Sequence, residues 1–146
     1  MTQAYTDLLK SFANHVGLDA DALAKTEEIV IDGLKVGLMY EGDEDMGDIV
    51  YFANLGAPAE HRVAEVYKTL LHANNLWAGT GGATLGLQPE TGSIVLAGRI
   101  DFNGVSAESL AMLLDAYADT ALHWKKYIAD QLSEHAEVPA AAFLRA

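Results

Sequence analysis

Residues 74–87, NNLWAGTGGATLGL, resemble a phosphate-binding loop in composition, because four glycines lie around two threonines. In phosphate loops a strand precedes the glycines and a helix follows, so that free N–H groups and the positive end of the helix face the anion. Here the predicted order is reversed, and neither the Walker lysine nor the G-x-G-x-x-G spacing is present. The stretch therefore predicts a structural turn without a nucleotide. Gly79, Gly81 or Gly82 is expected to take positive φ and end the helix, and Gly86 to serve a bulge or a close backbone approach.

Other residue types that bind metals or act as nucleophiles form no recognisable site. Residues 41–48, EGDEDMGD, fail the EF-hand pattern because Gly47 stands where an oxygen ligand is required, so a solvated loop is predicted. The five histidines lack the H-x-x-x-H spacing, and His123 is expected to be exposed. There is no cysteine and no G-x-S-x-G motif. We therefore expect no catalytic residue, no cofactor and no metal.

Charge and composition exclude several classes of partner. The 146 residues carry 9 Lys plus Arg against 21 Asp plus Glu, a formal charge of −12. This balance opposes binding to nucleic acid or to an anionic membrane surface. No 18-residue apolar run and no signal peptide are visible, so we expect the protein to reside in the cytoplasm without membrane insertion. With 51% apolar residues, the chain is expected to form one domain over residues 1–146.

The apolar pattern predicts an α+β fold with a five-stranded antiparallel sheet and three helices. Asp32-Gly33 marks a tight hairpin turn, Pro58 suits the first turn of the second helix, and Ser106 is a good N-cap for the last one. The predicted order is α-β-β-β-α-β-β-α, with a short additional turn of helix left open at residues 19–26. The predicted elements are a helix at 2–17, strands at 27–32, 34–40 and 49–55, a helix from 57 to about 77, two strands within 83–100, and a helix from 106.

Two of the predicted strands are apolar on both faces. In the third strand Val50 and Phe52 alternate with Tyr51, and the fifth strand shows the same pattern. Helices can cover only one face of the sheet, so the second apolar face is predicted to bind a partner. The residues expected on this partner surface are Met39, Val50, Phe52 and Val95, with Phe12 of the first helix adding to it.

Three segments resemble the type III secretion chaperones of the Tir-chaperone (CesT-like) family. The most specific is residues 70–100, LLHANNLWAGTGGATLGLQPETGSIVLAGRI, which resembles the family's signature region. Residues 54–60 resemble the loop before the second helix, and residues 110–128 are similar to the closing helix. The similarity extends over nearly the whole chain in the order of its elements.

The resemblance implies a homodimer without enzymatic activity that holds the N-terminal segment of a secreted effector in extended form. An alternative is a binding protein that sequesters a secretion regulator, and a less favoured one is a small ligand-binding domain or enzyme. The second helix carries a wide apolar stripe, and the resemblance implies that it forms the dimer together with residues 83–87. The predicted interface residues are Val63, Val66, Tyr67, Leu70, Leu71 and Leu85.

Overall fold

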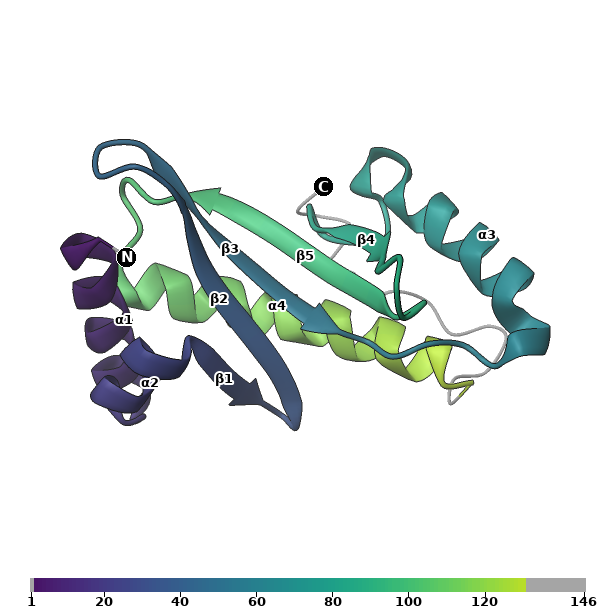
Figure 1. The fold of residues 1–146 in the computed structure, drawn as a ribbon, viewed down its shortest axis with the longest axis horizontal. Coiled ribbons are helices and arrows are strands. Elements are labelled where there is room, and N and C mark those ends of the chain that lie inside the picture. Colours follow the sequence, from purple (N-terminus) through teal and green to yellow (C-terminus); the bar gives the residue numbers. More distant parts are fainter. Residues whose placement is uncertain (1, 131–146) are drawn as a thin grey trace.

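The computed structural model describes residues 2–130, which form one antiparallel sheet with helices packed against it (Figure 1). The strand order in the sheet is β1-β2-β3-β5-β4. The predicted α+β class, the number of strands and their antiparallel pairing are confirmed. The strands are β1 (Glu28–Ile31), β2 (Leu34–Gly42), β3 (Gly47–Asn54), β4 (Thr84–Leu87) and β5 (Ile94–Asp101).

The described residues contain four α-helices, one more than the predicted order of elements includes. The additional helix is α2, which covers the residues where a short turn of helix was left open. Asp19 begins it by accepting a hydrogen bond from the Ala22 N–H. The helices are α1 (Gln3–Val16), α2 (Ala20–Thr26), α3 (Val63–Asn74) and α4 (Ala107–Ile128).

Local sequence signals set most of the helix ends. Thr2 begins α1, and Gly17 ends it with a φ of 81°. Ser106 begins α4 in a capping box with Ser109, as its side chain predicted. The second predicted helix starts later than expected, because Pro58 lies in an irregular segment before the 3-10 turn Glu60–Arg62.

The turn between β1 and β2 fixes which side chains face the core. Asp32 and Gly33 have φ values of 50° and 82°, the left-handed pair that a two-residue hairpin requires. Ile31 therefore pairs with Leu34, and every second residue of β2 from Leu34 to Leu38 faces inward. A shift of one residue would turn these side chains to the opposite face.

Helices α1 and α4 pack on this inner face. The rings of Tyr51 in β3 and Tyr117 in α4 meet edge to face at 5.0 Å, and the Tyr117 hydroxyl donates to the Leu96 carbonyl at 2.6 Å. Burial raises the pKa of Tyr117 above its usual value, with a smaller effect from Tyr51, so the phenol remains a donor. The opposite, outer face of the sheet carries no helix of the described residues (Figure 1).

Candidate functional site

The outer face of the sheet carries the apolar side chains that the sequence assigns to a partner surface. Met39 and Phe52 are 43% and 37% exposed, and Val50 and Val95 are partly buried. Their inward-facing neighbours Leu38 and Tyr51 belong to the core. The predicted strand phase is therefore correct, and these four residues lie on one face of three adjacent strands. We call Met39, Val50, Phe52 and Val95 the outer-face patch.

Strand register places the members of this patch beside one another. Met39 pairs with Val50, and Phe52 stands between Gly37 and Ala97. A Cβ atom at Gly37 would lie 2.4 Å from the Phe52 Cζ, so the ring rests over the glycine backbone. Gly37 was not predicted as part of this surface, although a glycine inside a strand often marks the close approach of another group. Gly37, Phe52 and Val95 help to line a hollow of about 540 Å³ on this face.

Charged residues limit the patch toward the β2–β3 turn. Arg99 of β5 bonds Asp48 of β3 through its Nη2 at 2.8 Å and its Nε at 2.9 Å, and its Nη2 lies 3.6 Å from a Glu41 oxygen. Lys35 and Glu28 form another pair, 3.3 Å apart, beside the hollow. The outer face thus has an apolar centre with ionic edges, the usual composition of a protein-binding surface.

Phe12 does not belong to this surface, which corrects the prediction from sequence. It is 3% exposed and lies in the core with Leu9 and Ala13 of the same helix. Its spacing from Leu9 and Ala13 places it on the apolar stripe of the helix, and this stripe faces the core.

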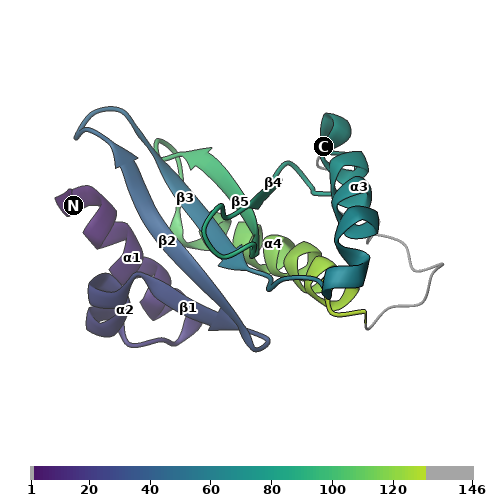
Figure 2. The ribbon, with the colours of Figure 1, turned by 45° about the vertical axis from the view of Figure 1, so that its right-hand side comes forward.

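A second apolar surface lies between α3 and β4, at the end of the molecule opposite α1 and α2 (Figure 2). An apolar groove of about 190 Å³ is lined there by Tyr67, Leu71 and Leu87, among others. Leu71 is 68% exposed, and Leu76, Trp77 and Leu87 are also exposed nearby. These last three were missed from sequence because Leu76 and Trp77 were placed at a helix end before a structural turn, and Leu87 was placed in a strand without a contact assigned to it.

The structure divides the six predicted interface residues. Leu71 is exposed, and Val63 and Tyr67 are partly buried, so these side chains are available to a second chain. Val66, Leu70 and Leu85 are instead buried within one chain, with Val66 at 0% exposure. Val66 therefore has no surface to offer a second chain, which corrects its assignment to the interface. Leu70 and Leu85 still line the groove beside Tyr67, so their part in an interface stays a prediction. The apolar stripe of α3 is wide because some of its side chains pack in the core of the same chain while Leu71 faces outward.

The glycine-rich stretch has a different conformation at the helix end from the one predicted. Leu76 and Trp77 take the left-handed conformation where the helical segment ends, with φ values of 54° and 56°. Gly81 and Gly82 do take positive φ as predicted, 64° and 93°, but only after the helix has ended. Gly79 is needed for close approach, since a Cβ there would lie 2.8 Å from the Ala73 Cβ. Its carbonyl accepts a hydrogen bond from the Trp124 Nε1 at 2.8 Å. Gly86 pairs one-to-one with Val95 and meets no neighbour, so neither predicted role for it is observed.

This geometry predicts that the stretch does not bind a nucleotide. It follows the C-terminal end of α3, where the helix presents carbonyl groups and a partial negative charge. Calorimetric titration with ATP and magnesium is expected to give no heat of binding. Micromolar affinity would contradict this interpretation of the turn.

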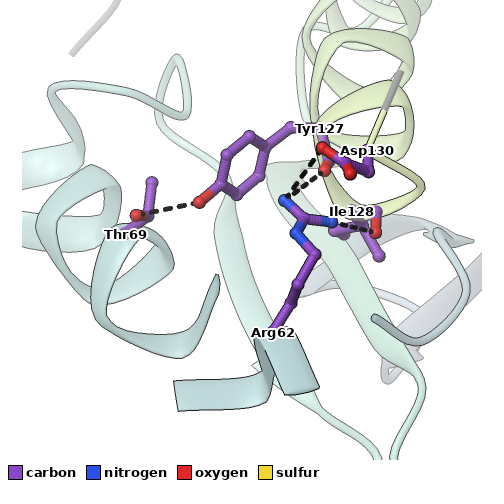
Figure 3. A network of polar contacts seen from close by, with 5 residues as sticks. All are labelled: Arg62, Thr69, Tyr127, Ile128 and Asp130. Atoms are coloured by element: carbon purple, nitrogen blue, oxygen red, sulfur yellow. Dashed lines mark hydrogen bonds and ion pairs between the residues drawn. The ribbon is translucent and has the colours of Figure 1, made fainter. Parts of the chain in front are cut away.

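Arg62 joins the start of α3 to the end of α4 (Figure 3). Its guanidinium donates to the carbonyl oxygens of Ile128 at 3.0 Å and Tyr127 at 3.2 Å, which are among the last in the helix. The Asp130 carboxylate lies 3.8 Å away, and the Tyr127 hydroxyl donates to Thr69 of α3 at 3.0 Å. A cation at a helix C-terminus is favourable, so this network fixes α3, and with it the second apolar surface, against α4.

Replacing Arg62 by Met is expected to reduce the free energy of unfolding by about 1–3 kcal/mol. The change keeps the apolar stem of a buried side chain but removes the donor from the buried Ile128 carbonyl, whereas the Tyr127 carbonyl keeps the Asp130 N–H at 3.0 Å. Urea unfolding followed by circular dichroism measures the loss. Arg99→Met is the control, because its ion pair is largely exposed and should contribute less than about 1 kcal/mol. Equal losses in the two variants would contradict the role given to Arg62.

The remaining candidate sites show structural roles. In the acidic loop, the Asp43 carboxylate accepts hydrogen bonds from the N–H groups of Asp45 and Met46, which shapes an exposed turn. His123 is partly buried against Trp124, not exposed as predicted; burial, and then the charge of Lys126, lower its pKa below the usual value. Within residues 2–130, no three His, Asp or Glu side chains gather as a metal site. No helix in this range has the length and apolar character needed to cross a bilayer.

Comparisons with known proteins relate this geometry to one family. The chain resembles a crystal structure of the ExsC–ExsE complex, with a TM-score of 0.66 and 18% identity over 88% of this chain and 96% of that chain. It also resembles the HopA1–SchA chaperone–effector complex, with a TM-score of 0.60 and 16% identity over 87% of this chain and 94% of that chain. No curated protein sequence gives a significant match. Residues 7–125 match the profile of the Tir chaperone protein (CesT) family, and the chain therefore belongs to that family.

Proposed function

We propose that this protein is a type III secretion chaperone that binds the N-terminal segment of an effector and keeps it in extended form. The observation that carries the proposal is the outer-face patch, an apolar surface on a sheet face that no helix of the described residues covers. Membership of the chaperone family supports it, as does the likeness to a chaperone–effector complex.

The patch suits an extended segment better than a folded domain. Its four side chains lie in rows across β2, β3 and β5, and the partly open hollow beside Phe52 can receive side chains of a bound chain. Alternate side chains of an extended chain can face such a surface, and its main-chain N–H and C=O groups can pair with the edge strand of a sheet. The open edge of β1 offers these groups partners, since the main-chain groups of Val30 point away from β2.

We also propose that two copies associate through the exposed part of α3 and the groove beside β4. Leu71, Tyr67 and Leu87 would supply the apolar contacts, and a two-fold arrangement would use each of them twice. Such a dimer places two outer-face patches on one particle, over which one effector segment can extend. The protein is proposed to act in the cytoplasm, to have no enzymatic activity and to need no cofactor.

The test begins with co-purification of the untagged effector from the native host. Identification by mass spectrometry is expected to give a secreted protein, and limited proteolysis of the complex should leave an N-terminal effector fragment protected by the chaperone. Circular dichroism of this fragment, with the chaperone signal subtracted, should show little helix. Protection of a folded domain elsewhere in the effector would contradict the extended mode of binding.

A further inference from the structure

The two edges of the sheet differ in whether their main-chain groups are available. At β4, Leu85 and Leu87 stand opposite Leu96 and Ile94. The N–H and C=O of Ile94 both bond residues 55–56, at 2.8 and 2.7 Å, so they point away from β4. The main-chain groups of Leu87 therefore point away from β5, and those of Leu85, two residues earlier, point the same way. A neighbouring strand would pair with these groups.

Asn74 already occupies the position of that neighbouring strand at Leu85. Its Oδ1 accepts from the Leu85 N–H at 2.9 Å, and its Nδ2 donates to the Leu85 carbonyl at 2.9 Å. The side-chain amide thus forms both hydrogen bonds that an antiparallel strand would form there. Since β4 has only four residues, Leu87 is its one remaining position with outward-facing main-chain groups.

We infer that Asn74 prevents β4 of one copy from pairing with an extended strand of a second copy. Exposed sheet edges promote pairing between chains, and one residue is too short a length to hold a strand. The proposed dimer would bring a second copy to this edge, and Asn74 then restricts the contact to side chains. At the other edge of the sheet, the Thr26 Oγ1 accepts from the outward Glu28 N–H at 3.4 Å, and no side chain within residues 2–130 bonds the main chain of Val30. The β1 edge therefore keeps the Glu28 carbonyl and both groups of Val30 for an added strand, and Asn74 is in this sense a specificity-determining residue.

Asn74→Ala is expected to make the protein associate beyond the mass of the unmodified chain. Its average mass by sedimentation or light scattering should rise at least about twofold as concentration increases, because Leu85 then offers both groups to another strand. Leu87→Pro is the rescue: proline removes an outward N–H while keeping the hydrogen bonds to β5, and edge strands tolerate it. The double variant should return from the mass of Asn74→Ala to that of Leu87→Pro alone, which is the reference because Leu87 also belongs to the proposed dimer contact.

Hydrogen exchange shows whether Asn74 protects the main chain of Leu85 or only supports the fold. The Leu85 amide is expected to exchange about tenfold faster in the double variant than in the unmodified protein, since one hydrogen bond is lost. If Asn74→Ala does not fold, Asn74→Ser, whose hydroxyl can bond only one group of Leu85, is measured in the same way. An unchanged mass in a folded Asn74 variant would overturn the inference. So would association that Leu87→Pro does not reverse.

This inference and the proposed dimer fail separately. The mass of the unmodified protein tests the dimer, whereas the change in mass between that protein and Asn74→Ala tests the closure of the β4 edge. A monomeric unmodified protein would remove the dimer and leave the second comparison intact.

Discussion

Phe52→Asp is expected to abolish effector binding while the protein remains folded. The ring rests over Gly37 at the centre of the outer-face patch and is 37% exposed. Burial of a large apolar side chain contributes about 1.5–3 kcal/mol, so its loss should raise the dissociation constant about 10-fold to 150-fold. A carboxylate buried without a partner would raise it further. Calorimetric titration with the identified N-terminal effector segment measures the change.

Two further variants show whether this effect comes from the outer face. Met112→Asp is the matched control, because Met112 is a large, exposed apolar residue of α4, away from the patch, and its replacement should leave the affinity unchanged. Leu38→Asp, on the inner face of the sheet, should prevent folding, since Leu38 is 2% exposed. If Phe52→Asp unfolds the protein and Leu38→Asp does not, the two faces are assigned the wrong way round.

Leu71→Glu is expected to convert the proposed dimer into a folded monomer. Leu71 is 68% exposed in the single chain, and a two-fold interface would bury it once in each copy. Two such side chains contribute about 3–6 kcal/mol, so the dimer dissociation constant should rise at least about a hundredfold. Light scattering of both proteins at micromolar concentration gives the masses, and circular dichroism shows that the variant is folded.

Neighbouring positions on α3 provide the controls. Glu65→Lys changes an exposed charge on the opposite side of the helix and should leave the dimer intact. Val66→Glu places a charge at a fully buried position and should unfold the chain, not merely separate two copies. A mass of one chain for the unmodified protein across micromolar concentrations would contradict the dimer itself.

Much of the fold follows from local sequence because short-range signals decide it. Asp32-Gly33 sets the hairpin and Ser106 begins α4, as predicted. Alternation in β3 correctly separates Phe52 from Tyr51, because successive side chains of a strand point to opposite faces. The helix end at Leu76 and Trp77 could not be predicted, because side chains that rarely adopt positive φ do so there when the surrounding contacts require it.

By itself, the sequence determined the order of the five strands and of three of the four helices, the phase of β2, β3 and β5, and the presence of a surplus apolar face. These depend on residues close together in the chain. Only the tertiary structure decided which apolar residues are buried within one chain, because burial depends on neighbours distant in sequence. Phe12 and Val66 lie in the core, whereas Leu71 remains exposed. Tertiary contact alone also assigned Asn74 to the edge of β4 and Arg62 to the end of α4, since a polar side chain carries no local signal for the main-chain group it will bond.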